Sequence, residues 1–178
     1  MKTYKVIKKY KRTWGSGNQR LVDISKEEQC NLFSTCFFLL QETNCLYFSK
    51  KTEKYSTVLE EYKLLKMIDH QNVIKPIELN TEFGLVIEHF DGKKLYKVDI
   101  HGIDNKYEWL QELESLIDYL RKKNIYSKID IHDSNLLLKI ANNKIIDWKL
   151  IDFEIFQPGD AFRNDDFIKS LRKKINGR

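Results

Sequence analysis

The sequence of 178 residues has few structure-breaking residues and no long apolar segment. It contains two prolines and seven glycines, and 42% of its residues are hydrophobic, which excludes a disordered or collagen-like chain. No apolar run approaches the roughly 20 residues that a membrane-spanning helix needs. Lysines follow Met1 where a signal segment would be apolar. We therefore expect a cytoplasmic protein, with delivery into a host cell by a specialised secretion system as the alternative.

Cysteine is also scarce. Cys30, Cys36 and Cys45 are odd in number and form no C-x-x-C pair, so the sequence indicates neither a disulfide framework nor a zinc site. We expect all three to act as small core hydrophobes in a reducing compartment.

The formal net charge of +5 is concentrated near the N-terminus. Residues 1–22 contain seven basic side chains and no acidic one, which leaves the rest of the chain slightly acidic. Residues 1–18 are predicted to be a basic arm that can contact an anionic partner, although nucleic acid is not the expected one. An edge strand with its apolar side packed down is the favoured structural alternative.

Hydrophobic periodicity predicts a chain that begins with strands and then mixes strands with helices. One helix is expected to be capped by Ser56, and another by Asn164. The predicted strands cover residues 19–25, 36–41, 45–49, 73–79, 84–88, 136–140 and 144–153, and the two later helices cover residues 107–123 and 165–175.

Three polar side chains have the spacing of a phosphoryl-transfer site. Asp130 and Asn135 lie five residues apart in a predicted loop, and Asp152 ends the strand that follows the next hairpin. Phosphoryl transfer needs a carboxylate that orients the attacking hydroxyl and hard oxygen donors that hold Mg²⁺ on the phosphates. These three residues supply that set.

With these residues the chain resembles the protein-kinase-like superfamily. Asp130 and Asn135 match the catalytic-loop pattern D-x-x-x-x-N, and Asp152-Phe153-Glu154 resembles the metal-binding D-F-G, with Glu154 in place of glycine. The resemblance implies that Asp130 is catalytic and that Asn135 and Asp152 are metal ligands. It extends over roughly residues 19–172.

In the N-terminal half, the resemblance implies an ATP site. Lys50 matches the strand lysine that contacts the α- and β-phosphates, and Glu61 matches the helix acid that pairs with it. Lys51 and Glu60 are the alternatives, one residue away in each case.

Residues 86–92 resemble the hinge of the family. The resemblance implies that backbone groups of Glu88, His89 and Phe90 hydrogen-bond adenine and that Ile87 is the gatekeeper.

Several departures point to a minimal kinase. The expected phosphate loop, residues 25–33, contains no glycine, and Ile129 replaces the arginine that reads a phosphorylated activation loop. His132, which we expect to be catalytic or to orient the loop, occurs at the same place in lipopolysaccharide core heptose kinases and in antibiotic and choline kinases. Only a short segment follows Glu154, as in small effector kinases of bacterial pathogens. Asp165 or Asp166 resembles the buried aspartate that ties the catalytic loop.

The sequence therefore predicts an α+β, minimal two-lobed protein-kinase-like fold of bacterial type. Residues 19–88 are expected to form a small ATP-binding lobe, with an antiparallel sheet and one helix, and residues 89–178 a reduced, mainly helical catalytic lobe. The predicted activity is transfer of the γ-phosphate of ATP, with Mg²⁺, to a hydroxyl on a protein, as by a Ser/Thr kinase. A kinase for a sugar, lipopolysaccharide or other small molecule is one alternative, and a pseudokinase that serves as a binding module is another.

Overall fold

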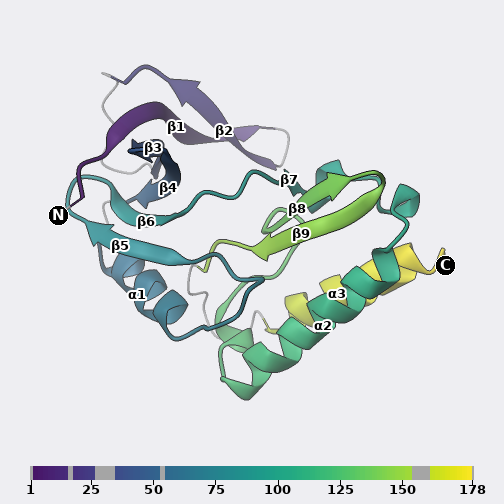
Figure 1. The fold of residues 1–178 in the computed structure, drawn as a ribbon. Coiled ribbons are helices and arrows are strands. Elements are labelled where there is room, and N and C mark those ends of the chain that lie inside the picture. Colours follow the sequence, from purple (N-terminus) through teal and green to yellow (C-terminus); the bar gives the residue numbers. More distant parts are fainter. Residues whose placement is uncertain (1, 16–17, 27–34, 53–54, 154–160, 178) are drawn as a thin grey trace. The chain divides into compact units, whose positions relative to one another are not determined.

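The computed structural model describes residues 2–15, 18–26, 35–52, 55–153 and 161–177 (Figure 1). The chain divides into two compact units. The first comprises Met1–Met67 and Lys75–His89, and the second comprises Ile68–Ile74 and Phe90–Arg178. Each unit combines an antiparallel sheet with helix, in agreement with the predicted α+β class. No helix in the described part of the chain is long and apolar enough to span a membrane.

The first unit is a six-stranded antiparallel sheet with one α-helix, in the strand order β2-β1-β3-β4-β6-β5 (Figure 1). The hairpin predicted around residues 42–44 is confirmed as β3 and β4. Its elements are β1 (Lys5–Gly15), β2 (Asn18–Ile24), β3 (Cys36–Glu42), β4 (Cys45–Lys51), α1 (Tyr55–Lys66), β5 (Pro76–Asn80) and β6 (Gly84–Glu88).

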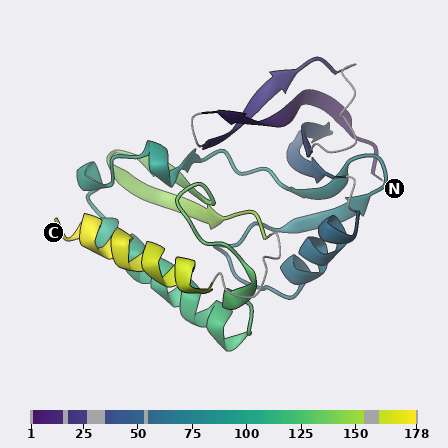
Figure 2. The ribbon, with the colours of Figure 1, turned by 180° about the vertical axis from the view of Figure 1, so that it is seen from behind.

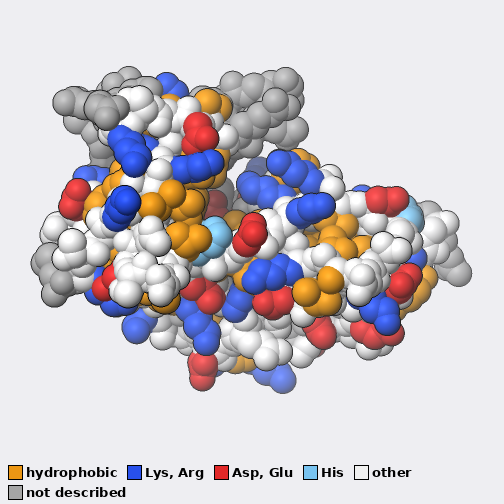
Figure 3. All heavy atoms as spheres, turned by 45° about the horizontal axis from the view of Figure 1, so that its top comes forward, with side chains coloured by type: hydrophobic (Ala, Val, Ile, Leu, Met, Phe, Trp, Pro, Cys, Tyr) orange, Lys and Arg blue, Asp and Glu red, His pale blue; other side chains and the backbone are white. Residues whose placement is uncertain are grey.

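The basic N-terminal segment is mostly a strand of this sheet. β1 pairs with β2 on one side and with β3 on the other, so it lies inside the sheet and β2 forms the edge. Some of its lysines contact acids within the unit: Lys2 lies 3.0 Å from Glu42, and Lys8 lies 3.8 Å from Asp23. On the face drawn in Figure 3, Lys and Arg side chains alternate with acidic and hydrophobic ones.

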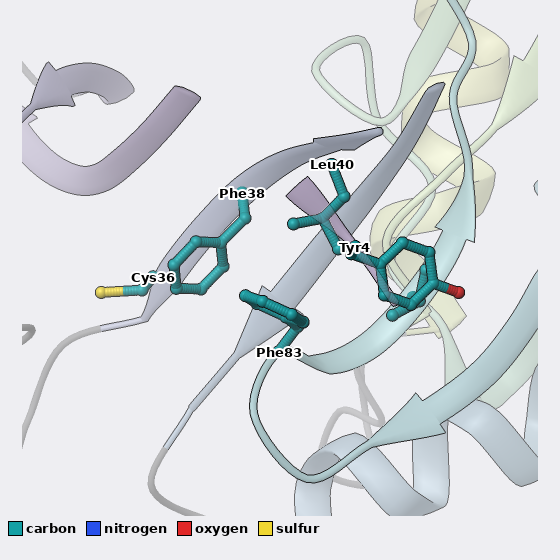
Figure 4. Close-up of a cluster of buried hydrophobic side chains, with 6 residues drawn as sticks. Tyr4, Cys36, Phe38, Leu40 and Phe83 are labelled. Atoms are coloured by element: carbon teal, nitrogen blue, oxygen red, sulfur yellow. The ribbon is translucent and has the colours of Figure 1, made fainter. Parts of the chain in front are cut away.

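Strand β3 is buried on both faces, which explains its continuous apolar sequence. One face carries a hydrophobic cluster in which the Phe38 and Phe83 rings meet edge to face, with centroids 5.5 Å apart (Figure 4). The cluster consists of Tyr4, Cys36, Phe38, Leu40, Phe83 and Val86. The other face carries the Lys50 side chain, because Lys50 is the β4 partner of Phe37 and successive residues point to opposite faces.

The cysteines differ from their predicted role. Cys36 is buried in the cluster, as expected, but it is disulfide-bonded. Cys45 is free and exposed at the start of β4, so it is not a core hydrophobe. The β3–β4 turn leaves this position open to solvent, and no pattern within the hairpin sequence distinguishes it from a buried one.

The second unit contains a three-stranded antiparallel sheet, β7-β8-β9, and two long helices that lie side by side (Figure 2). Its elements are β7 (Lys93–Lys94), the 3₁₀ turns η1 (Leu95–Lys97), η2 (Ile100–Gly102) and η3 (Tyr126–Lys128), α2 (Lys106–Lys122), β8 (Leu136–Ala141), β9 (Lys144–Leu150) and α3 (Ala161–Ile175). The apolar stripe predicted for residues 107–123 is buried along α2, at Trp109, Leu113, Leu116, Ile117 and Leu120.

The strand predicted over residues 73–79 begins only at Pro76. Val73 instead forms a parallel bridge with Leu150, and the backbone nitrogen of Ile74 donates to the Leu150 oxygen over 3.1 Å. The Leu150 nitrogen donates to the oxygen of Asn72 over 2.8 Å. The segment Ile68–Ile74 therefore packs with the second unit, although the sequence assigned it to the small lobe.

Candidate active site

In the first unit, Lys50 and Glu61 form a buried ion pair. The Lys50 Nζ lies 3.1 Å from Glu61 Oε2, and the side chains are only 7% and 4% exposed. Lys50 stands near the end of β4, and Glu61 stands on the face of α1 that also buries Val58 and Leu65, at helical spacing. Burial of two charges costs several kcal/mol per ion, which only a close contact offsets. The close contact between the two charges therefore fixes the position of the Lys50 ammonium group.

The two alternative residues, Lys51 and Glu60, do not take part in this ion pair. Glu60 is exposed on α1, and Lys51 points to the opposite face of the sheet from Lys50 and donates to the Glu82 oxygen over 2.7 Å. Of the alternatives that the sequence left open, the structure therefore brings together Lys50 and Glu61.

A glycine allows another strand to approach Lys50 closely. Gly84 begins β6 with a φ of +75°, and a Cβ added to it would lie 2.4 Å from the Lys50 backbone oxygen. Only glycine combines that backbone conformation with such a contact. Gly84 therefore sets the position of the β4 backbone at the lysine.

The segment that resembles a hinge begins at the end of β6. Ile87 pairs with Phe48 on β4 and with Pro76 on β5. The Glu88 nitrogen donates to the Lys75 oxygen, and the Glu88 carboxylate accepts from the Lys75 nitrogen, both over 2.9 Å. This reciprocal pair holds the strand end in place.

Beyond Glu88, His89 is half-buried and Phe90 is buried. The Phe90 oxygen accepts a hydrogen bond from the Gly92 nitrogen over 3.0 Å, and the Lys139 ammonium lies 4.3 Å from the centre of the Phe90 ring. The adenine contacts expected of Glu88, His89 and Phe90, and the gatekeeper role of Ile87, stay predictions.

In the second unit, Asp130 and Asn135 lie at the two ends of a closed loop. The Asn135 amide nitrogen donates to the Asp130 backbone oxygen over 3.1 Å, and the Asn135 backbone nitrogen donates to the His132 oxygen over 3.0 Å. Asn135 is buried, whereas the Asp130 side chain is 20% exposed. The loop thus holds its asparagine firmly and leaves the aspartate carboxylate accessible.

Both ring nitrogens of His132 lie close to other groups of the same loop. Its Nδ1 accepts from the Ser134 backbone nitrogen over 3.2 Å, and its Nε2 lies 3.6 Å from Asp130 Oδ2. The first contact fixes the ring, and the second brings it beside the predicted catalytic carboxylate. This geometry fits a residue that orients the Asp130 side chain.

Asp152 follows β9 and is linked to the loop through its neighbour. The Ile151 nitrogen donates to the Asn135 oxygen over 2.8 Å. Asp152 has a φ of +63°, and the next residue, Phe153, is fully buried. A left-handed backbone at a non-glycine residue costs energy and is common where a side chain is aimed for function. Glu154 lies outside the described residues, as does most of the predicted phosphate loop.

Asn135 and Asp152, the predicted metal ligands, carry oxygen atoms of the kind that a magnesium ion shared with phosphates needs. The Asn135 nitrogen is engaged with Asp130, so its oxygen is the atom that can face a cation. Among the residues that the structure describes, no three His, Cys, Asp or Glu side chains are grouped to hold a metal alone. Mg²⁺ commonly takes one or two protein oxygens and completes its shell with phosphate oxygens and water. Asn135 and Asp152 match that pattern.

Asn164, which we predicted to cap the last helix, instead holds the loop that carries Asp130. Asn164 is fully buried. Its Oδ1 accepts from the Ile131 nitrogen over 2.7 Å, and its Nδ2 donates to the oxygens of Ile129 and Tyr126 over 2.9 and 3.0 Å. Three hydrogen bonds therefore tie α3 to the backbone on both sides of Asp130.

The prediction that Asp165 or Asp166 is the buried tie is wrong. Asp166 is exposed, and the Asp165 carboxylate accepts from the Tyr126 hydroxyl over 2.7 Å and from Arg121 over 2.8 Å. The Tyr126 hydrogen bond is the main cause that lowers the pKa of Asp165, and burial raises the pKa of Tyr126. The signal for Asn164 was present in the sequence, because Ile168, Leu171 and Ile175 follow it at helical spacing and share its buried face.

The chain is similar in sequence to protein kinases. The chain is 32% identical over 142 residues to calcium-dependent protein kinase 4 of Plasmodium berghei, covering 72% of this chain and 24% of that protein. It is 29% identical over 149 residues to the serine/threonine-protein kinase ppk34 of Schizosaccharomyces pombe, covering 72% of this chain and 42% of that protein. The chain thus spans less than half the length of these relatives. No protein-family model matches it.

The fold also matches a solved structure. A crystal structure of Rad53 in complex with AMP-PNP aligns with a TM-score of 0.57 and 17% identity, covering 85% of this chain and 47% of that one. The chain belongs to the protein-kinase-like superfamily. Both relatives are named as protein kinases, and ppk34 is named as a serine/threonine-protein kinase.

Proposed function

We propose that this chain is an ATP-dependent phosphotransferase that moves the γ-phosphate of Mg·ATP to a hydroxyl on a protein. The buried Lys50–Glu61 ion pair carries the proposal, because it holds an ammonium group ready for an anionic ligand at the cost of burying two charges. The relatives named above supply the substrate class, since they are protein kinases.

Each residue has a specific part in this proposal. Lys50, held by Glu61, contacts the α- and β-phosphates. Asp130 orients the attacking hydroxyl and accepts its proton, and Asn135 and Asp152 hold Mg²⁺, which neutralises the charge of the phosphates when bound. A loose transition state needs alignment more than a strong base, so positioning of the Asp130 carboxylate is the main requirement.

Two residues of the second unit, His132 and Asn164, help to position the Asp130 carboxylate. His132 contacts the Asp130 carboxylate, and Asn164 fixes the backbone on either side of it. A displacement of about 1 Å in such a group is enough to cost about a hundredfold in rate. We propose that both are positioning residues.

Transfer of labelled γ-phosphate to a mixed protein acceptor tests this function. Lys50→Met and Asp130→Asn are expected to lower the rate by at least about a hundredfold. Lys51→Met and Asp104→Asn are the matched controls, since they alter the adjacent lysine and an exposed carboxylate elsewhere in the second unit. Equal activity of Lys50→Met and wild type would contradict the proposal. Transfer to glycans but not to proteins would instead support the alternative of a glycan kinase.

A further inference from the structure

The face of the sheet that carries Lys50 also carries a group of aromatic side chains. Phe37 is the β3 partner of Lys50, and Phe48 precedes Lys50 by two residues on β4, so all three side chains point to the same face. Tyr10 on β1 is the partner of Phe37 and joins them. These side chains lie within the first unit.

The rings hold one another in place. Phe37 and Phe48 are stacked, with centroids 5.7 Å apart and an interplanar angle of 25°, and the Tyr10 ring lies 6.3 Å from that of Phe48. The Arg12 guanidinium lies 5.3 Å from the centre of the Phe37 ring. Because Phe37 and Phe48 turn their flat faces to each other, a third ring enters between them only by forcing them apart.

Phe48 lies between the two ends of the nucleotide position that follows from the proposed function. Lys50 marks the phosphate end, and Glu88 marks the base end. Phe48 stands two residues, or about 6.6 Å, along β4 from Lys50, and it pairs with Ile87, which directly precedes Glu88. A nucleotide that reaches from Lys50 to Glu88 therefore passes over Phe48.

We propose that Phe48, held by Phe37 and Tyr10, limits the room for the base and so weakens the binding of purine nucleotides. Side chains on a strand stand roughly perpendicular to the sheet, so a phenylalanine raises the surface under the ligand by the height of its ring. Phe48 is a specificity-determining residue in this view and takes no part in the phosphoryl transfer. The inference rests on the proposed function for its ligand.

Isothermal titration of the full chain with Mg·ATP and with Mg·tripolyphosphate tests the inference. Tripolyphosphate keeps the phosphates but lacks ribose and base. Phe48→Ala is expected to lower the Kd for Mg·ATP by about tenfold, as relief of overpacking predicts, and to leave the Kd for Mg·tripolyphosphate unchanged. Phe48→Leu, which removes less volume and protects the fold, should give a smaller gain of the same sign.

Two further variants separate the possible outcomes. Leu46→Ala changes an exposed side chain on the same strand and face and should leave both Kd values unchanged. Lys50→Met should weaken both ligands, which tests the proposed function alone.

An unchanged or higher Kd for Mg·ATP in Phe48→Ala would overturn the inference and leave the proposed function standing, provided that wild type binds and Lys50→Met does not. Binding by Phe48→Ala where wild type shows none would support the inference. Absence of ATP binding in both would overturn the inference together with the proposed function.

Discussion

The side-chain oxygen of Asn164 accepts a hydrogen bond from the backbone nitrogen of Ile131 over 2.7 Å, and this contact joins the last helix to the loop that carries Asp130. Both residues are buried, so water cannot replace the lost partner if either side of the contact is removed. The position of the predicted catalytic carboxylate thus depends on a helix that begins about 30 residues later in the chain.

Asn164→Ala is expected to lower the free energy of unfolding by about 2 to 3 kcal/mol, because it leaves the Ile131 nitrogen and two carbonyl groups without a partner. Urea denaturation measures the change. Ser170→Ala, at an exposed position on the same helix, is the control and should shift the free energy of unfolding by less than about 0.5 kcal/mol. Equal effects of the two substitutions would contradict a role for Asn164 in holding the loop.

The Lys50–Glu61 pair predicts a non-additive double-mutant cycle. Lys50→Met leaves a buried carboxylate and Glu61→Leu leaves a buried ammonium, and each is expected to cost about 3 to 5 kcal/mol. The double variant replaces both charges by apolar side chains and should be more stable than either single variant. Chemical denaturation of all four proteins gives the coupling energy, and strictly additive losses would show that the two charges do not interact.

Gly84 and Gly177 form a matched pair for backbone strain. Both have a positive φ, of +75° and +69°, but only at Gly84 would a Cβ meet the Lys50 backbone; at Gly177 it would meet nothing within 4 Å. Gly84→Ala should therefore cost clearly more stability than Gly177→Ala, whose penalty is about 1 kcal/mol from the left-handed backbone alone. Thermal unfolding compares them. We also expect Gly84→Ala to weaken ATP binding, because the β4 backbone at Lys50 must move.

His70 predicts a dependence of stability on pH. Burial is the main cause that lowers the pKa of His70 below 6.5, with a further contribution from Lys149, while Asp69 acts in the opposite direction. As the pH falls from 7 through 6.5, the unfolded chain therefore binds the proton before the folded protein does, and the free energy of unfolding decreases. The decrease stops once the pH is below the pKa in the folded state.

Urea denaturation between pH 7.5 and about 5 measures this decrease. His70→Gln should flatten the slope over that range, whereas His101→Gln, at an exposed position, should leave it unchanged. The Asn72 nitrogen donates to His70 Nδ1 over 3.2 Å, so the glutamine variant should also be less stable than wild type at pH 7.5. Identical slopes in wild type and His70→Gln would contradict the assignment to this residue.

Local patterns predicted the elements that hydrophobic spacing and turns define. The β3–β4 and β8–β9 hairpins and helix α2 lie close to their predicted positions, because alternation and helical periodicity act within a few residues. The buried role of Asn164 was accessible to the same reasoning, since it shares a helical face with Ile168 and Leu171. Its side chain suggested a cap only because asparagine favours that position.

The sequence alone determined which chemical groups are available: the oxygen donors at Asp130, Asn135 and Asp152, the lysine near a helix acid, and the order of strands and helices around them. Tertiary structure decided which of two neighbouring side chains is buried: Lys50 rather than Lys51, and Asn164 rather than Asp165. It also placed β1 beside β3 and seated the segment Ile68–Ile74 against β9. The physical reason is that one step along a strand or helix turns a side chain to another face, and only long-range packing selects the face that is buried.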